Sequence, residues 1–165
     1  MDEVEIVSLI PDEWQKAYEI RVESVRNEPC AFGQSVEQAV ATSENEWRTR
    51  LSRKEYLFAK HNNTIVGIAC VVTEGAAKVQ HVGIIFSVYV KSEYRGKGVG
   101  KKLLQAILEL AKERKLLKVR LYAAVTQKTA IALYESLGFY KMADFKQEML
   151  IGEKYIDEIA MEKFL

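Results

Sequence analysis

The sequence predicts an α/β (α+β) fold, with a mixed, mainly antiparallel sheet of seven strands flanked by four helices. Two observations lead to this prediction. Runs of β-branched and aromatic residues are mostly joined by short polar turns, which connect antiparallel strands. In the middle of the chain, a strand, a glycine-rich turn, an amphipathic helix and another strand follow one another, and such a crossover makes a parallel pair. The sheet is therefore mixed.

The individual elements follow from periodicity and from the residues that end them. Strands are predicted at 4–9, 56–60, 64–73, 84–90, 118–124, 139–150 and 154–164, and helices at 13–27, within 35–53, at 99–114 and at 126–137. One face of the first helix carries Trp14, Ala17, Tyr18, Arg21, Val22 and Val25.

Prolines, serines and glycines set the boundaries. Pro29 stops the first helix, and the segment 27–34 is then an irregular loop that either packs or forms a substrate wall. Ser35 and Ser43 are suited to cap the helical turns that follow. Asn62-Asn63, Gly138 and Gly152 are turn or helix-ending residues between the later elements.

Composition limits the class of protein. The chain has 165 residues, 48% of them hydrophobic and 28% charged, so we expect one domain over residues 1–165. A net charge of +1 favours neither nucleic acid nor an acidic membrane surface as a partner. No apolar run approaches the ~20 residues that span a bilayer.

Cysteine and histidine usage favours a cytoplasmic protein without a metal. Cys30 and Cys70 are far apart and fit no metal-ligand pattern, so we expect reduced thiols. The first residues are acidic where a signal peptide would be basic. His61 and His81 are the only histidines, too few to predict a metal site.

The turn at 95–101 has the composition of an anion site. Gly96, Gly98 and Gly100 alternate with Lys97, Val99 and Lys101, after Arg95 and before a helix. Glycines allow a ligand to approach the backbone, and the first helical turn offers unpaired N–H groups and a partial positive charge. Neither a Walker loop nor a Rossmann fingerprint fits the spacing. We infer a pyrophosphate ligand; the alternative is a glycine-rich turn without one.

The order of elements and two motifs resemble the GNAT superfamily of acyl-CoA-dependent N-acetyltransferases. The pyrophosphate motif Arg/Gln-x-x-Gly-x-Gly/Ala is met by Arg95, Gly98 and Gly100. The second signature, Ala-x-x-x-Tyr-x-x-x-Gly-Phe, is met from Ala130 to Phe139. The first motif alone is weak, but both in order, each after a strand, make a strong case over essentially the whole chain.

The resemblance implies acetyl-CoA as cosubstrate and assigns its contacts by position. The backbone of Val88, Tyr89 and Val90 would pair with the pantetheine arm, and the amides from Gly96 to Lys101 would hold the pyrophosphate. Tyr134 would be the general acid; the other interpretation is a core tyrosine with a satisfied hydroxyl.

The sequence departs from the resemblance at two positions. Gln127 stands where relatives often have an asparagine that contacts the cofactor arm. Tyr122 stands where the ribosomal-protein N-terminal acetyltransferases have a glutamate base. A protonated amine of pKa ≈ 10.4 costs roughly 4–5 kcal/mol to deprotonate at pH 7, so a base or water chain is needed. The candidates are His81, Glu74 and Glu28.

These features lead to one main functional hypothesis and two alternatives. The main one is an N-acetyltransferase that acts on the primary amine of a small metabolite. The alternatives are acetylation of a protein N-terminus or lysine, and a non-catalytic acetyl-CoA sensor. A homodimer is also expected, as in many relatives, through apolar residues of the last strands: Tyr155, Ile159, Met161 and Phe164.

Overall fold

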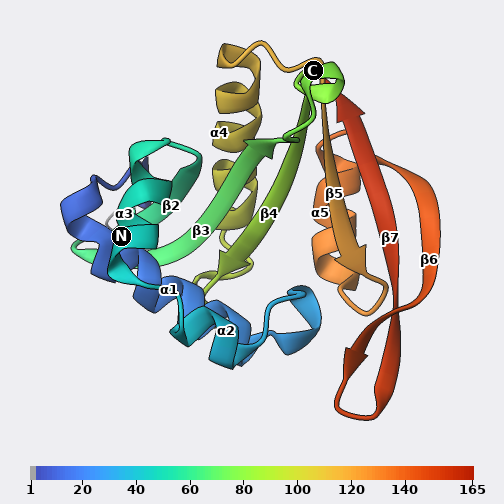
Figure 1. The fold of residues 1–165 in the computed structure, drawn as a ribbon, viewed down its shortest axis with the longest axis horizontal. Coiled ribbons are helices and arrows are strands. Elements are labelled where there is room, and N and C mark those ends of the chain that lie inside the picture. Colours follow the sequence, from blue (N-terminus) through green and yellow to red (C-terminus); the bar gives the residue numbers. More distant parts are fainter. Residues whose placement is uncertain (1–2) are drawn as a thin grey trace.

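The computed structural model describes residues 3–165. Seven strands spread along this range form one sheet (Figure 1). In chain order the elements are β1 (Glu5–Val7), α1 (Trp14–Asn27), α2 (Val36–Val40), α3 (Glu44–Ser52), β2 (Tyr56–His61), β3 (Thr64–Thr73), β4 (Val82–Val90), α4 (Val99–Glu113), β5 (Lys118–Ala124), α5 (Lys128–Ser136), β6 (Tyr140–Ile151) and β7 (Lys154–Phe164).

The strand order confirms the predicted fold class. The sheet runs β1-β2-β3-β4-β5-β7-β6, with β4 and β5 parallel and the other neighbours antiparallel. Residues 3–165 contain five α-helices, one more than the four predicted. The predicted helical region 35–53 forms two helices, α2 and α3, which Ser35 and Ser43 cap separately. Each serine Oγ accepts a hydrogen bond at 3.2 Å from the N–H three residues later.

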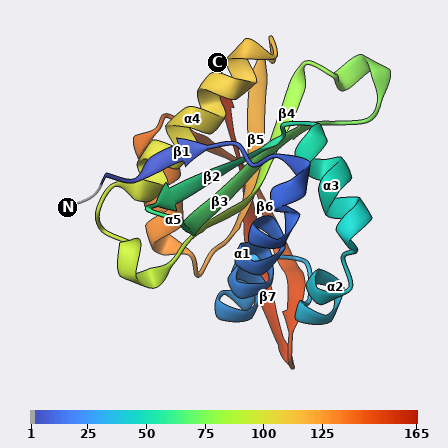
Figure 2. The same ribbon diagram turned by 90° about the vertical axis from the view of Figure 1, so that its left-hand side faces the viewer.

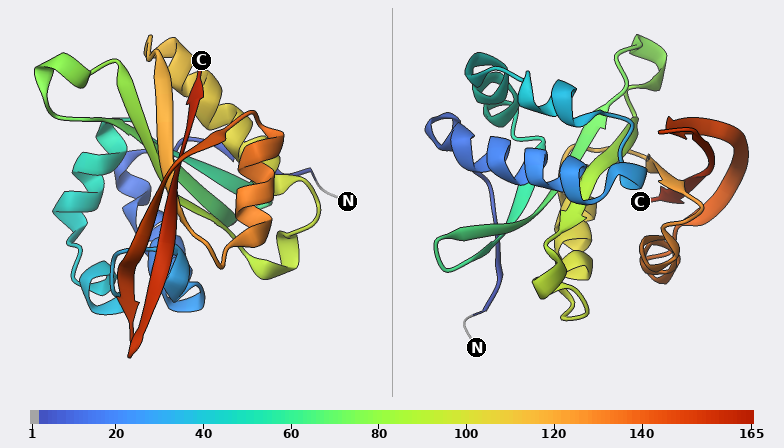
Figure 3. Two further views of the ribbon diagram at one scale, coloured as in Figure 1. Left: turned by 90° about the vertical axis from the view of Figure 1, so that its right-hand side faces the viewer. Right: turned by 90° about the horizontal axis from the view of Figure 1, so that it is seen from below.

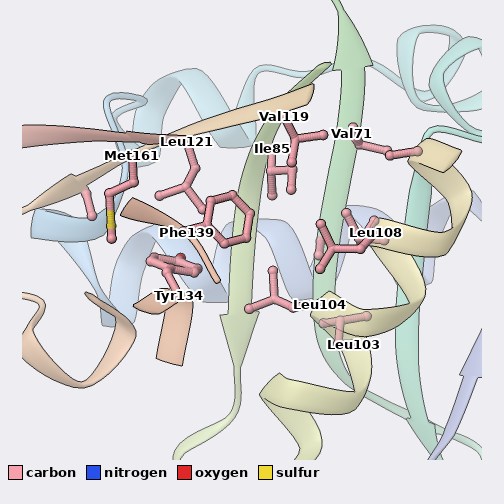
Figure 4. Packing of buried hydrophobic residues seen from close by; sticks show 14 of the residues in the cluster. Val71, Ile85, Leu103, Leu104, Leu108, Val119, Leu121, Tyr134, Phe139 and Met161 are labelled. Carbon is pink, nitrogen blue, oxygen red and sulfur yellow. The ribbon is translucent and has the colours of Figure 1, made fainter. Parts of the chain in front are cut away.

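Helices cover both faces of the sheet. Figure 3, in the view from below, shows α1, α2 and α3 on one face and α4 and α5 on the other, and Figure 2 shows α1 and α3 beside the strands. On the second face, Leu103, Leu104 and Leu108 of α4 point toward the sheet residues Val71 and Ile85 (Figure 4). The apolar stripe that predicted α4 is thus the stripe that packs on the core.

The first face has its own core. Trp47 of α3 and Phe58 of β2 are fully buried there, together with Ile20 of α1. The same face receives Tyr89 of β4, whose hydroxyl accepts from Asn27 Nδ2 and donates to Glu23 Oε1, both at 3.1 Å. These bonds attach the carboxyl end of β4 to α1.

Strand β4 contains a bulge at Ser87. Its register against β3 passes from Ile68–Tyr89 to Cys70–Phe86, so β4 has one extra residue, and Ser87 is buried with φ of 58°. As a result Ile85 and Val88 pack toward α4, whereas Tyr89 packs toward α1.

β4 and β5 already separate before the bulge. Among residues 3–165 they pair only from Val82–Lys118 to Ile84–Arg120, and Figure 1 shows them splayed apart toward their carboxyl ends. The rest of β4 therefore has backbone groups on its β5 side that no neighbouring strand covers.

The predicted dimer surface on the last two strands is only partly exposed. Tyr155 and Phe164 are exposed, but Ile159 and Met161 are buried in the core. The expectation that all four supply exposed apolar surface is wrong for these two, because β7 lies inside the sheet between β5 and β6.

Candidate active site

The glycine turn forms the start of α4 at the end of the sheet where β4 and β5 separate. Gly96 and Gly98 have φ of 72° and 80°, a region that favours glycine, and a Cβ at either position would meet nothing within 4 Å. Gly100 serves packing, since its Cβ would lie 3.3 Å from Leu133 of α5. Gly98 is the N-cap of α4, so the amides that follow it have no intrahelical acceptor.

The basic side chains of the turn are largely engaged by the protein itself. Arg95 donates from Nε to the Val90 carbonyl and pairs through Nη1 with Glu28, both at 2.8 Å. Lys97 donates to the Glu93 carbonyl at 2.8 Å. The turn is therefore built to present backbone amides, while its cations hold its shape.

Three adjoining cavities extend from this turn across the sheet. The outer cavity, about 430 Å³, lies between the turn, β4 and α5. The middle cavity, about 280 Å³, lies between the carboxyl halves of β4 and β5. The arginine cavity, about 570 Å³, lies under α1, α2 and α3. Tyr134 and Gln127 line both the outer and middle cavities, and Arg21 and Ser87 line both the middle and arginine cavities.

The outer cavity brings together nearly all the residues that the sequence assigns to cofactor binding. These are Val88, Tyr89, Val90, Arg95, Gly96, Gly98, Val99, Gly100, Lys101 and Gln127, with Tyr134 at the inner end. Lys97 is not among them. Gln127 is the N-cap of α5, makes no side-chain cap bond and lines both cavities.

Tyr134 has the surroundings of a proton donor. It is 6% exposed and packs edge-to-face on Phe139, with 6.0 Å between ring centroids (Figure 4). Burial raises the pKa of its phenol to about 12, so the hydroxyl is protonated at neutral pH. No hydrogen bond to this hydroxyl is found within residues 3–165.

Two of the three predicted candidates for the general base lie away from the cavities. His81 and Glu74 lie near the amino-terminal end of β4, where His81 O accepts from Leu117 N–H at 2.8 Å, and neither lines any of the three cavities. Glu28 lines the outer cavity but is paired with Arg95. Among the described residues, the carboxylate that lines the middle cavity with Tyr134 is that of Glu158.

Glu158 lies on β7 one strand away from Tyr122. It pairs with Ala124 of β5, two residues along from the Tyr122–Ala160 pair, so Glu158 and Tyr122 share a face of the sheet. Burial, and secondarily the charge of Glu148, raise the pKa of Glu158 above its ordinary value. A raised pKa makes a carboxylate a better proton acceptor.

Comparison with known proteins decides the family. A model of the Acetyltransferase (GNAT) family matches residues 14–139, which include the turn, both motifs and all of β4 and β5. The chain belongs to the GNAT acetyltransferase family. The recognition made from the two motifs is confirmed.

Relatives and solved structures agree with this assignment. N-acetyltransferase 8 of Rattus norvegicus is 32% identical over 66 residues, 40% of this chain and 30% of that protein. A GNAT acetyltransferase from Streptococcus pneumoniae is 22% identical, with a TM-score of 0.89 over 99% of this chain and 100% of that one. The phosphinothricin acetyltransferase of Sinorhizobium meliloti, solved with acetyl-CoA, is 22% identical with a TM-score of 0.85, over 100% and 89% of the two chains. The match spans less than a third of the length of the first curated relatives.

Sequence reasoning missed three residues that line the candidate site. Ser87 is a polar residue inside an apolar run, which is the one signal that could have indicated the bulge. Arg21 is a cation on the face of α1 that carries Ala17 and Val25. Glu158 gave no signal, because its place depends on β7 inserting between β5 and β6.

Two further observations bear on partners. No helix within residues 3–165 is long and apolar enough to cross a membrane. Within the same range, no group of three or more histidine, cysteine or acidic side chains could hold a metal ion.

Proposed function

We propose that the protein is an acetyl-CoA-dependent N-acetyltransferase that acetylates the primary amine of a small metabolite. The observation that carries this proposal is that the cavities adjoin one another and share lining residues. A glycine cradle on the α4–α5 side opens onto Tyr134, and the space continues between β4 and β5 to a separate cavity under α1. Donor and acceptor would enter from opposite faces and meet at the middle cavity.

The residues of the outer cavity fit acetyl-CoA. A pyrophosphate needs several converging donors and close backbone approach, which Gly96, Gly98 and the first amides of α4 provide. The pantetheine arm carries amides that pair like a strand, and the β5 side of β4 is uncovered beyond Ile84. When bound, acetyl-CoA supplies the acetyl group as a thioester.

Tyr134 would act on the leaving sulfur. Its hydroxyl is protonated at neutral pH, so it can donate a hydrogen bond or proton but cannot serve as the base. Its pKa of about 12 lies above that of an ordinary thiol, about 8.5. Tyr134 therefore stabilises the departing thiolate by a strong hydrogen bond, and its contribution falls at the low end of general acid catalysis.

Glu158 would accept the proton of the acceptor amine. It lines the same cavity as Tyr134, is partly buried and has a raised pKa. Its position on β7 compensates for Tyr122, which stands on β5 where the ribosomal-protein enzymes have a glutamate. The base and the acid would then lie on two sides of the reacting thioester.

The loop after α1 supports a small molecule over an extended peptide. This loop walls both the outer and the middle cavity through Ala31 and Phe32, while α2 and α3 contribute Gln38 and Arg50 to the lining of the arginine cavity. An extended peptide needs an open groove. Within this proposal a cytoplasmic location rests on the two unpaired cysteines, Cys30 and Cys70. A homodimer rests on exposed apolar residues of β6 and β7, such as Leu150 and Tyr155.

A two-part experiment tests the proposal. Calorimetry measures acetyl-CoA binding, and a thiol-release assay then screens amines and peptides. We expect binding and turnover with at least one small amine. Turnover with peptides alone would favour the protein acetyltransferase, and binding without any turnover would favour the sensor. Absence of acetyl-CoA binding would refute all three.

A further inference from the structure

The arginine cavity contains a buried cation without a counter-ion. Arg21 is only 9% exposed, and its guanidinium lies 4.6 Å from the centroid of the Phe32 ring. Its Nε and Nη2 both donate to Gln34 Oε1, at 3.1 and 2.9 Å. Its Nη1 is buried with no hydrogen-bond partner, and no carboxylate of residues 3–165 forms an ion pair with it.

This arrangement is unfavourable unless another molecule completes it. Buried charges in proteins are normally paired, and buried donors are normally bonded. A neutral glutamine and an aromatic ring orient the guanidinium but leave its charge uncompensated. Burial accordingly lowers the pKa of Arg21 from its ordinary value, although an arginine stays protonated. The group that would complete the site is an oxyanion, and a carboxylate matches the free edge of a guanidinium.

The surroundings of Arg21 favour an anion in the same place. Arg50 and Arg53 line the cavity with Arg21, against one lining carboxylate, Glu55. Arg50 is already paired with Glu46, which compensates its charge. Arg21 and Arg53 against Glu55 still leave the lining net positive, which favours an anion.

The anion site at Arg21 adjoins the proposed site of acetyl transfer. Arg21 lines both the arginine cavity and the middle cavity, and Tyr134 and Glu158 also line the middle cavity. An anion bound to Nη1 would therefore lie beside the cavity that Tyr134 and Glu158 line.

We infer that Arg21 binds the carboxylate of the acetyl acceptor, so the acceptor is a free amino acid or a short aminocarboxylate. The inference rests on the proposed function, because it names the acceptor of that reaction. The amine of the acceptor faces Glu158 while its carboxylate is held by Arg21. An amine that lacks the carboxylate leaves the buried guanidinium uncompensated and binds poorly.

The test compares matched acceptors. Thiol release from acetyl-CoA is measured with free L-amino acids and with the amines that lack their α-carboxylate, such as tyrosine against tyramine and lysine against cadaverine; β-alanine and γ-aminobutyrate represent short aminocarboxylates. We expect kcat/KM to be about 10- to 100-fold higher for the carboxylate member of an accepted pair, as one charge-assisted hydrogen-bonding partner provides. Equal values in wild-type protein would overturn the inference without any variant.

Variants then assign the preference to Arg21. Arg21→Met keeps an apolar stem against Phe32 and removes the charge, and should abolish the preference mainly through KM. Arg21→Lys keeps the charge without the planar fork and should restore part of it. Arg26→Met, on the exposed last turn of the same helix, is the matched control and should leave the preference unchanged. A preference that survives in a folded Arg21→Met protein would overturn the inference.

A binding measurement separates this inference from the proposed function. Calorimetry measures how tightly the amino acids of this test bind to protein saturated with CoA, where no acetyl transfer occurs. Amino acid binding that depends on Arg21, without turnover under any condition, would support the anion site and refute the acetyltransferase. Turnover of simple amines, with no Arg21-dependent binding of amino acids, would support the acetyltransferase and refute the anion site.

Discussion

Gly98→Ala should separate the phosphate-binding role of the turn from its role in the fold. The added Cβ meets nothing within 4 Å, so the structural cost is the φ of 80° alone, about 1–2 kcal/mol for a residue other than glycine. For a protein of this size that lowers Tm by roughly 2–8 °C. The same methyl group lies at the N-cap of α4, beside the amides that would hold the pyrophosphate. We expect acetyl-CoA affinity to fall at least about tenfold, or about 1.4 kcal/mol.

Gly152→Ala provides a control with the same backbone cost. Gly152 has φ of 61°, and its Cβ would also meet nothing within 4 Å, but it lies in the β6–β7 turn and lines none of the three cavities. Both variants should lose similar stability in thermal unfolding, whereas only Gly98→Ala should weaken acetyl-CoA in calorimetry. S-acetylpantetheine, which has no pyrophosphate, should react equally well with wild type and Gly98→Ala. Equal acetyl-CoA affinities in the two variants would refute the assignment of the turn.

Three more measurements examine the chemistry and the assembly. Tyr134→Phe keeps the ring on Phe139 and should lower kcat about 10- to 100-fold with little change in acetyl-CoA affinity; wild-type turnover would remove Tyr134 from the mechanism. Glu158 must be ionised to accept a proton, so kcat/KM should rise with pH through its raised pKa, and Glu158→Gln should lose that limb and about 10²–10⁴-fold in rate; an unchanged profile in Glu158→Gln would assign the base elsewhere. Light scattering at micromolar concentration should give the mass of a dimer, and a monomer mass would rule out association through β6 and β7.

The parts of the site that depend on local backbone chemistry were predictable from the sequence. Glycine at 96 and 98 is required by a positive φ, and the stripe from Val99 to Ala111 is required by packing on one face of a sheet. Both requirements leave a pattern within a few neighbouring residues. The proposed cofactor side of the site is built from these local features, so a sequence pattern can predict it.

The acceptor side depends on contacts between distant segments, so the sequence did not locate it. His81 and Glu74 were candidates because they precede the central strand, but Tyr134 and the middle cavity lie near the carboxyl end of β4. Glu158 reaches that end only through the pairing of β7 with β5. A cation on a mostly apolar helix face usually extends its charged end to solvent. That Arg21 is instead buried without a counter-ion depends on all the elements packed around it, which the sequence pattern does not show.

The bulge at Ser87 connects the two sides. A buried serine with φ of 58° costs about 1–3 kcal/mol and persists only where the surrounding structure imposes it. Here β3 holds one flank through the Cys70–Phe86 pair, and α1 holds the other through Tyr89 and the 3.0 Å Lys91–Glu23 ion pair. The extra residue puts Val88 on the face of the sheet that α4 and α5 cover, while Phe86 lines the arginine cavity, and pairing with β5 has ended by this point. The bulge thus lies just beyond the point where β4 and β5 part, between the proposed donor and acceptor sides of the sheet.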